Sequence, residues 1–253
     1  MRQALMLGLD RAAIVSGVLE GRGLVAHAPF SLCSWALDAN GPIYEYDPLQ
    51  AKSLLEGAGW SDHDGDGTRD KDGRSLTLSL VVQDERSNRA VADAIARQWA
   101  RIGVRTEVVP LAFADLVEGR LQTRLFDAAL VDMSLEGDPD PYVFWHSSQA
   151  QAGGQNYSSF VDQEADGLLE AARREWDTEK RRQMYQRFQQ IFSQEVPALP
   201  LYYPVYSYAV DDGVHGVRLG PMTRPEDRFR SLPEWYLNSR RLRMNEGAVD
   251  TGE

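Results

Sequence analysis

The sequence has only one cysteine, Cys33, among its 253 residues. A disulfide bond within the chain is therefore excluded, and so are zinc sites that are built from several thiolates. Long apolar runs are also missing, because the longest one falls far short of the ~20 residues that a transmembrane helix needs. We therefore expect no membrane span in this chain.

Positive charge is scarce as well. The chain has 27 lysine and arginine residues against 38 aspartate and glutamate residues, which gives a formal net charge of −11. Proteins that bind the nucleic-acid backbone need a basic surface, so we expect no nucleic-acid partner. The same charge disfavours binding to anionic membranes.

The start of the chain lacks the pattern of a secretory signal peptide. Its apolar stretch is interrupted by Asp10 and Arg11, and no cleavage site of small residues follows. We therefore expect no export signal in this chain as it stands.

Signatures of catalysis are missing too. The sequence contains no phosphate-binding loop, no dinucleotide-binding glycine pattern after a strand and no nucleophile elbow. Its four histidines, at positions 27, 63, 146 and 215, form no pair at the spacing that joins two imidazoles to one metal ion. His146 does lie near Asp138, Asp140, Ser147 and Ser148, so a hydrolase stays an alternative to a packing histidine. We favour a protein that is not an enzyme.

Hydrophobic periodicity predicts alternating strands and helices, which is an α/β pattern with crossover connections. Asp47-Pro48 is expected to open a helix, and Asp177 to cap another. The polar end, 239–253, is expected to be disordered. The other predicted helices span 2–19, 87–102, 112–121, 161–175 and 178–194, and the predicted strands span 76–82, 106–111, 125–133, 199–211 and 214–219.

An acidic, glycine-rich loop lies between the helix that opens at Pro48 and the strand at 76–82. Asp62, Asp64, Asp66 and Asp70 stand at positions 1, 3, 5 and 9 of a calcium-loop pattern, with a glycine at position 6. The glutamate expected at position 12 is replaced by Gly73. The loop is therefore either a partial Ca²⁺ site or an Asp/Gly turn whose side chains bond to their own backbone.

Ordered motifs run through the chain. The first helix contains Arg2-Gln3-Ala4-Leu5 and Leu9-Asp10-Arg11-Ala12-Ala13-Ile14-Val15. The later motifs are Tyr46-Asp47-Pro48, Ala58-Gly59-Trp60, Arg69-Asp70-Lys71-Asp72-Gly73, Phe126-Asp127-Ala128, Asp138-Pro139-Asp140-Pro141, Trp145-His146-Ser147-Ser148, Asn156-Tyr157, Leu201-Tyr202-Tyr203 and Trp235-Tyr236-Leu237. Their order and spacing resemble family 5 of the extracellular solute-binding proteins, which serve peptide and nickel ABC importers.

The resemblance implies the α/β fold of a type II (class C) periplasmic binding protein, with a mixed sheet flanked by helices. Family members are roughly twice as long and have two lobes that close on the ligand. Residues 1–200 resemble the second ligand-binding lobe, and 201–238 resemble return strands that complete the first lobe. The chain thus resembles the C-terminal half of a family member.

The family's function implies a substrate-binding component of an ABC importer. Such a protein captures peptides or similar polar solutes and passes them to ABC permease subunits. The full-length protein is then expected in the periplasm, or outside the cell and anchored to the membrane. No cofactor is required, and Ca²⁺ is the only ion that the sequence suggests.

The ligand site is expected in the loop after the strand at 125–133. Peptide-binding relatives have a tryptophan there, followed three residues later by an aspartate that pairs with the peptide's α-ammonium group. Here Met133 replaces the tryptophan, and either Glu136 or Leu135 takes the aspartate position. Glu136 keeps amine capture, whereas Leu135 removes it and favours a sugar, an opine-like solute or a blocked peptide. The implied ligand contacts are Met133, Ser134, Glu136, Asp138, Asp140, Trp145, Asn156 and Tyr157.

Other interpretations of these residues stay open. Asp138 and Asp140 are typical of a turn and a helix cap, Trp145 of core packing, and Asn156 and Tyr157 of loop ordering. For the whole chain, the alternatives to an importer component are a calcium-stabilised interaction module, a hydrolase, and a remnant of a split gene. A remnant would expose apolar residues such as Tyr202, Tyr203 and Tyr206.

Overall fold

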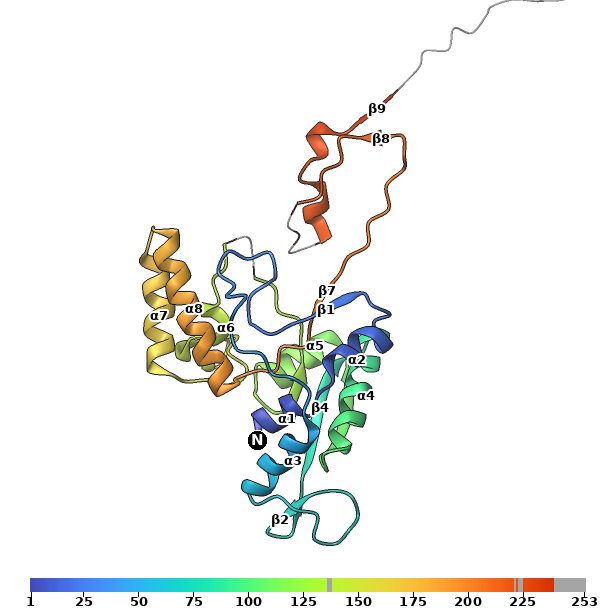
Figure 1. Cartoon of the computed structure of the whole chain (residues 1–253), viewed down its shortest axis with the longest axis vertical. Coiled ribbons are helices and arrows are strands. Elements are labelled where there is room, and N and C mark those ends of the chain that lie inside the picture. The colour runs from blue at the N-terminus through green and yellow to red at the C-terminus, as the bar shows by residue number, and fades with distance from the viewer. Residues whose placement is uncertain (136–137, 221, 223–224, 239–253) are drawn as a thin grey trace, which may run out of the picture. The chain divides into compact units, whose positions relative to one another are not determined.

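A computed structural model describes residues 1–135, 138–220, 222 and 225–238. It separates into two units, Met1–Val205 and Tyr206–Glu253 (Figure 1). The first unit includes Tyr202–Pro204, which pairs with one of its strands, whereas the predicted division into lobes at residue 200 stays a prediction. The tail predicted to be disordered lies outside the described residues.

The first unit is built on a three-stranded sheet with the strand order β5-β4-β6. Both pairings are parallel, and the antiparallel pairings of the described residues lie in separate two-stranded sheets and in the isolated bridge between Ser61 and Asp70. The connections between the strands contain the helix α4, and the short helix α5 followed by the π-helical turn η2. The bounds are β4 Thr77–Gln83, β5 Arg105–Leu111, β6 Ala128–Leu130, α4 Arg86–Ala100, α5 Phe113–Leu116 and η2 Val117–Leu121.

The strand β6 is much shorter than the predicted strand at 125–133. The Asp127 carboxylate accepts hydrogen bonds from the backbone N–H and the hydroxyl of Ser79, at 2.8 and 2.7 Å. A side chain therefore occupies the donor on β4 that regular pairing with the main chain would use. The ladder begins only after Asp127.

The main core lies on one face of the sheet. Leu80 and Val82 of β4 pack there against α4 and against helices from the start of the chain. The predicted helix 2–19 is interrupted after Gly8, where an added Cβ would meet Ile102 at 2.6 Å. Asp10 then caps a new helical segment by accepting a bond from the Ala13 N–H, at 2.8 Å. The segments on this face are α1 Arg2–Leu7, α2 Arg11–Ala13, the π-helical η1 Ile14–Val18 and α3 Pro48–Gly57.

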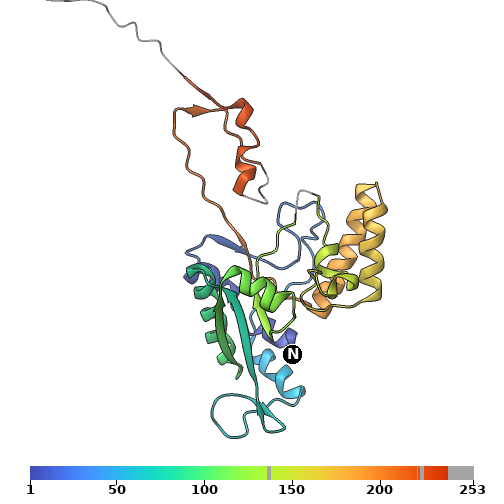
Figure 2. The same cartoon turned by 180° about the vertical axis from the view of Figure 1, so that it is seen from behind.

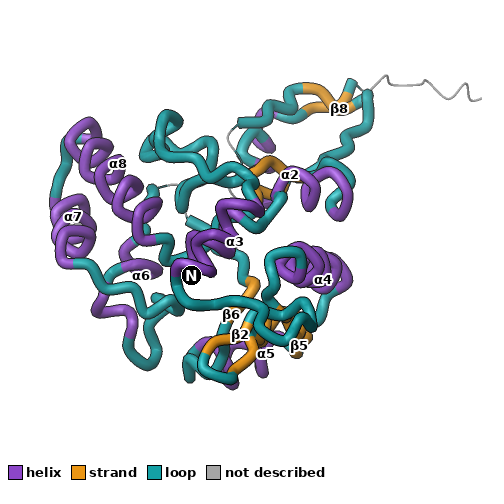
Figure 3. The backbone as a smooth tube through the Cα atoms, turned by 60° about the horizontal axis from the view of Figure 1, so that its bottom comes forward, coloured by secondary structure: helices purple, strands orange, loops and turns teal. Residues whose placement is uncertain are grey.

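A second core is formed largely by helices. Helices α7 and α8 lie side by side (Figure 3) and enclose Tyr185 and Phe188, which are almost completely buried. Asp177 caps α8 as predicted, accepting bonds from the Glu179 and Lys180 N–H groups at 2.9 and 3.2 Å. The helices of this region are α6 Tyr142–Trp145, the 3-10 turn η3 Ser147–Ala150, α7 Gln163–Arg174 and α8 Thr178–Glu195.

Short antiparallel pairs complete the described structure. Only Tyr202–Pro204 of the strand predicted at 199–211 forms, because its partner β1 offers just three residues. In the second unit, the strand predicted at 214–219 is limited to Val214–His215, and Tyr208, Phe229 and Trp235 form an aromatic cluster. These pairs are β1 Gly23–Val25 with β7 Tyr202–Pro204, β2 Asp70–Lys71 with β3 Arg74–Ser75, and β8 Val214–His215 with β9 Tyr236–Leu237, while η4 Pro225–Phe229 and η5 Leu232–Glu234 are 3-10 turns.

Alkaline pH should test how the strand β7 is held. The Tyr203 hydroxyl lies 2.7 Å from the Phe30 carbonyl oxygen and 3.2 Å from that of Ala28, and burial raises the pKa of Tyr203 to about 12. A pKa that is raised in the folded state gives stabilisation that is complete below pH ~10 and is lost toward pH ~12. We expect the unfolding free energy of the wild type to fall by about 2–3 kcal/mol more than that of Tyr203→Phe over this range. Urea unfolding at several pH values measures it, and parallel pH profiles for the two proteins would contradict the prediction.

Candidate functional site

The carboxyl ends of the three parallel strands meet at one edge of the first unit. The helix α4 packs on the face formed by Leu80 and Val82, whereas Leu116 and Leu121 pack on the opposite face, against Val81 (Figures 1 and 2). The connections that leave β4 and β5 therefore go to opposite faces. In open α/β sheets, the binding crevice lies outside the carboxyl ends of the strands at such a point.

Each strand contributes different chemistry to this edge. Asp84 follows β4, Phe113 follows β5, and Met133 stands three residues after β6. Phe113 is 64% exposed and Met133 is 41% exposed. The edge thus presents apolar side chains to solvent, beside a carboxylate. No motif in the sequence marks Asp84 or Phe113, although their positions just after predicted strands are a signal for them.

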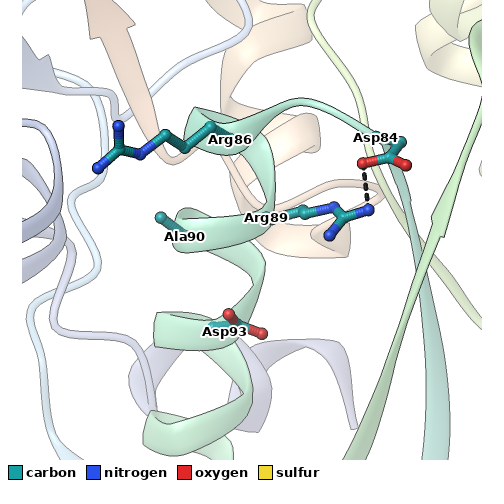
Figure 4. Close-up of a pocket in the computed structure, with 5 residues that line it drawn as sticks. All are labelled: Asp84, Arg86, Arg89, Ala90 and Asp93. Carbon is teal, nitrogen blue, oxygen red and sulfur yellow. Dashed lines mark ion pairs between the residues drawn. The ribbon is translucent and has the colours of Figure 1, made fainter.

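A surface hollow of about 440 Å³ lies where β4 passes into α4 (Figure 4). Asp84 forms an ion pair with Arg89 across this hollow, while Arg86 extends away from that pair. The hollow therefore has side chains of both signs of charge in its lining. Its lining residues are Asp84, Arg86, Arg89, Ala90 and Asp93.

The loop after β6 runs from a third cluster, formed by Val81, Leu116 and Leu121 on the other face of the sheet, to the second core. Val131 packs against the cluster of Val81, Leu116 and Leu121, and Leu135 packs against the second core. Between these two anchors, Met133 and Ser134 are exposed. Glu136 lies outside the described residues, so amine capture by that residue stays a prediction.

Asp138 and Asp140 are both paired with arginines. Arg181 donates to Asp138 at 2.9 Å, and Arg173 donates to Asp140 at 2.7 Å. Asp140 also accepts a 3.2 Å hydrogen bond from the Tyr142 N–H, which forms the turn expected for it, whereas Pro141 is the N-cap residue of α6. The two carboxylates therefore fix the segment that leads into α6 to the helices α7 and α8.

Trp145 and Asn156 lie inside the protein. Trp145 is 4% exposed and packs edge-on against Phe192 in the second core. Asn156 is fully buried, and both atoms of its amide bond to protein groups. The structure thus gives Trp145 a packing role and Asn156 a loop-ordering role. It does not bring these two side chains together with the exposed Met133 and Ser134.

Tyr157 packs against the cluster of Val81, Leu116 and Leu121, on the face of the sheet opposite α4. The Arg124 guanidinium lies 5.0 Å from the centre of its ring. Arg124 also donates to the carbonyl oxygens of Gln149, Gln151 and Gly154, so it orders the polar loop before Tyr157. No sequence pattern identified this arginine, because its bonds go to main-chain atoms 25 to 30 residues away.

The predicted serine–histidine alternative forms a local cap. The Nδ1 atom of His146 lies 2.8 Å from the Ser148 hydroxyl and accepts the Ser148 backbone N–H at 3.1 Å. The Nε2 atom faces Glu170 at 3.4 Å and Asp166 at 3.8 Å. The His146 side chain thereby caps the 3-10 turn η3 by accepting the Ser148 backbone N–H. Asp166 accepts from the backbone N–H and the hydroxyl of Ser147, which fixes α7 to this turn.

The acidic loop brings together three of its four predicted ligands. Carboxylate oxygens of Asp62, Asp64 and Asp66 all lie within 4.8 Å of one another. Asp70 is held apart, because it accepts from the His63 backbone N–H at 3.0 Å and lies 2.9 Å from the His63 Nδ1 atom. The hydrogen bond from the His63 backbone N–H is the largest of the effects that lower the pKa of Asp70. The clustered carboxylates also accept N–H bonds from the loop's own backbone, as expected for an Asp/Gly turn.

None of the helices in the described part of the chain is both long and apolar enough to cross a membrane.

Comparison with proteins of known sequence gives a consistent result. The chain is 33% identical over 241 residues to the oligopeptide-binding protein AppA of Bacillus subtilis, covering 94% of this chain and 44% of that protein. It is 28% identical over 228 residues to a dipeptide-binding protein of Pseudomonas aeruginosa, covering 88% of this chain and 41% of that protein. The chain thus spans less than half the length of these curated relatives.

Solved structures confirm the predicted α/β fold of a type II periplasmic binding protein. AppA from Bacillus subtilis in complex with a nonapeptide has a TM-score of 0.79 and 31% identity, covering 94% of this chain and 47% of that one. NikZ from Campylobacter jejuni in complex with Ni(L-His) has a TM-score of 0.78 and 27% identity, covering 92% and 48%.

The match to a protein family decides the classification. Residues 1–156 match the middle region of the bacterial extracellular solute-binding proteins, family 5. This match covers more than half of the 253 residues and agrees with both relatives and both structures. The chain therefore belongs to the bacterial extracellular solute-binding proteins of family 5.

Proposed function

We propose that this chain is the C-terminal, ligand-binding lobe of the binding component of an ABC importer, and that the whole protein captures peptides or similar polar solutes. The relatives are named as oligopeptide- and dipeptide-binding proteins, and one solved relative holds a nonapeptide. The partners in this proposal are ABC permease subunits. The place is the periplasm or the outer side of the cytoplasmic membrane.

The observation that carries the proposal is the open carboxyl edge of the parallel sheet. Phe113 and Met133 are exposed there and belong to none of the described cores, whereas Leu111, Leu116 and Val131 nearby pack in the cluster with Val81. A ligand that covers this edge gains from removing apolar surface from water, at roughly 25 cal/mol per Å². Main-chain groups and Ser134 next to Met133 offer the hydrogen bonds that a peptide backbone needs.

We assign direct contact with the ligand to Met133 and Ser134. Asp138 and Asp140 act by holding the loop to Arg181 and Arg173. Trp145, Asn156 and Tyr157 act from further away, because their packing and hydrogen bonds shape the segments on either side of that loop. In this proposal the described edge recognises the ligand mainly through its shape and its main chain.

A charge placed at position 133 should weaken this recognition. We expect Met133→Asp to weaken peptide binding at least about tenfold, because a carboxylate would have to be desolvated against the ligand. The matched control is Leu49→Asp, at an exposed leucine on the helix α3. Isothermal titration with a panel of short and nonameric peptides measures both variants.

Two results would contradict the proposal. One is equal binding by Met133→Asp and the wild type, which removes the loop after β6 from the site. The other is the absence of heat with every peptide, for this chain and for the longer protein that includes it, which removes peptides as the ligand class.

We propose that the protein acts by binding alone and does not catalyse a reaction. The relatives named above are binding proteins, and the His146 Nδ1 atom is engaged by the Ser148 backbone. A panel of ester and amide substrates tests the hydrolase alternative. Turnover that disappears in His146→Ala would overturn the proposal.

The acidic loop carries a second, separate proposal. We propose that Asp62, Asp64 and Asp66 bind Ca²⁺ weakly. Three carboxylates within 4.8 Å repel one another, and a divalent cation relieves that repulsion. The bidentate glutamate is missing and the loop is exposed, so we expect a dissociation constant on the order of 10⁻⁴–10⁻³ M.

Calcium titration with a chelator-treated protein tests this proposal. We expect about 10 mM CaCl₂ to raise the midpoint of thermal unfolding of the wild type by a few degrees, and not that of Asp64→Asn. The control is Asp115→Asn, which removes an exposed carboxylate from α5 and should keep the response. A wild type that does not respond to calcium would leave the loop as a self-bonded turn.

A further inference from the structure

Arg11 is a buried arginine that forms no ion pair with any described carboxylate. Its side chain lies in the first unit at only 5% exposure. The guanidinium group donates to the main-chain carbonyl oxygens of Ala26, Tyr44 and Pro200, the last at 3.0 Å. Burial lowers the pKa of Arg11, so placing the charge there costs free energy. An apolar side chain would fill this space at lower cost, and this points to a geometric role for the arginine.

The carbonyl groups come from segments that are far apart in sequence. Ala26 follows directly after β1, and Pro200 stands two residues before β7. The backbone N–H of Ala26 also donates to the carbonyl of Leu201, at 3.2 Å. Arg11 therefore binds carbonyl groups that flank both strands at one end of the β1–β7 pair. We call this pair, Gly23–Val25 with Tyr202–Pro204, the ribbon.

The opposite end of the ribbon is where the first unit ends. Gly23 pairs with Pro204 there, and the Val205 N–H donates to the Arg22 carbonyl at 3.2 Å. The boundary between the two units follows immediately, between Val205 and Tyr206. The ribbon is thus held at its base by Arg11, and the chain leaves the first unit from its tip.

The surroundings of Arg11 support a fixed geometry. The His27 Nδ1 atom lies 3.4 Å from the guanidinium, and burial together with the charge of Arg11 lowers the pKa of His27. A neutral imidazole leaves that nitrogen free to accept. Tyr44 continues the connection, because its hydroxyl donates to the Ser193 carbonyl in α8 at 2.8 Å. Arg11 therefore joins the ribbon to both cores.

We infer that Arg11 is a positioning residue that clamps the β1–β7 ribbon to the first unit, so that bending between the units occurs after Val205. This inference rests on the proposed function for its purpose, since closure of two lobes requires a defined point of bending. Arginine suits the task because its planar fork reaches carbonyl groups in several directions, whereas a lysine ammonium is a single point.

The test compares Arg11→Lys with Arg69→Lys. Arg69 is an equally suitable control, because it is 7% exposed and donates to the Ile102 and Trp60 carbonyls of the same unit without touching the ribbon. Hydrogen exchange is measured for peptides that cover 22–27 and 200–206. We expect Arg11→Lys to speed exchange in these peptides at least about tenfold relative to peptides from β4 and α8, and Arg69→Lys to leave the ribbon peptides unchanged.

A distance measurement separates positioning from ordinary stabilisation. Spin labels are placed at Glu118→Cys in the first unit and Asp212→Cys in the second, in a Cys33→Ser background; all three positions are exposed. We expect the distribution of label distances to broaden in Arg11→Lys and to keep its width in Arg69→Lys.

Equal behaviour of the two lysine variants, or unchanged ribbon exchange in Arg11→Lys, would overturn the inference and leave Arg11 as one more core residue. Lysine keeps the charge and much of the volume, so the test does not depend on an Arg11→Met variant that fails to fold. Failure of peptide binding would overturn the proposed function, but it would leave the exchange and distance results unaltered.

Discussion

Asn156→Ala is expected to lower the free energy of unfolding of the first unit by about 3–4 kcal/mol. The side-chain amide donates to the carbonyl oxygens of Phe160 and His146, at 2.8 and 3.2 Å, and accepts from the Phe160 N–H and the Ser158 hydroxyl, at 3.1 and 3.0 Å. Alanine removes all four bonds. The backbone groups of Phe160 would then be left without these partners in the interior, and each such group costs about 1–3 kcal/mol.

Urea unfolding followed by circular dichroism measures this loss. The control is Asn40→Ala, at an exposed asparagine whose side chain should contribute almost nothing. A fall of less than about 1 kcal/mol in Asn156→Ala would contradict the loop-ordering role. Weaker peptide binding without a loss of stability would instead favour the original prediction that Asn156 contacts the ligand.

The sequence predicted most elements whose signals are local. Helix α8 begins at Thr178 because Asp177 caps it, and α3 begins at Pro48 because Asp47 accepts two backbone N–H bonds. The alternation of apolar residues located β4 within one residue of its observed start. These signals depend on neighbours within a few positions, so one sequence is enough to read them.

The errors arose where distant residues decide the local structure. The predicted helix 2–19 is divided because Gln98, on α4, bonds to both the backbone N–H and the carbonyl of Asp10. The strand at 125–133 is shortened because Asp127 bonds to Ser79, 48 positions away. No pattern within either segment indicates these partners, so propensity alone cannot find them.

The candidate site shows the same limit. The structure has loops at both places where the sequence predicted them, after β6 and before β4, because motif order and spacing indicate them. Their roles in binding a ligand or Ca²⁺ stay predictions. The sequence did not show that Arg181 and Arg173 neutralise Asp138 and Asp140, since those pairs join positions 43 and 33 residues apart. It also gave no indication of the role of Arg11, because the partners of this side chain are main-chain carbonyl groups rather than carboxylates.

The packing and the ion pairs described above together hold the loop after β6 in place. The proposed ligand loop runs from the cluster of Val81, Leu116 and Leu121 to the second core, so its shape depends on the relative positions of the sheet and the helices α7 and α8. The paired arginines of these helices hold the part that leads into α6. Damage to the second core should therefore disturb the proposed ligand site through the loop that packs against this core.

Phe188→Ala should show this dependence and give the largest loss of stability. Phe188 is completely buried in the second core and packs its ring against Phe30 and Phe192, with centroids 6.3 and 6.2 Å apart. Truncation removes an aromatic ring from a closed core and leaves a cavity, which costs about 3–5 kcal/mol. We expect this loss in urea unfolding, together with weaker peptide binding, because α8 carries the Arg181 that holds Asp138.

Phe113→Ala is the matched control for the Phe188 variant. The same ring is removed, but from a side chain that is 64% exposed at the carboxyl edge, so the unfolding free energy should change by less than about 0.5 kcal/mol. Its peptide binding should nevertheless weaken, because Phe113 belongs to the proposed ligand surface. The two phenylalanines thus separate support of the site from contact with the ligand. If Phe188→Ala lost stability but bound peptides as the wild type does, the helices α7 and α8 would not hold the loop, and the arginine pairs would be local to the second core.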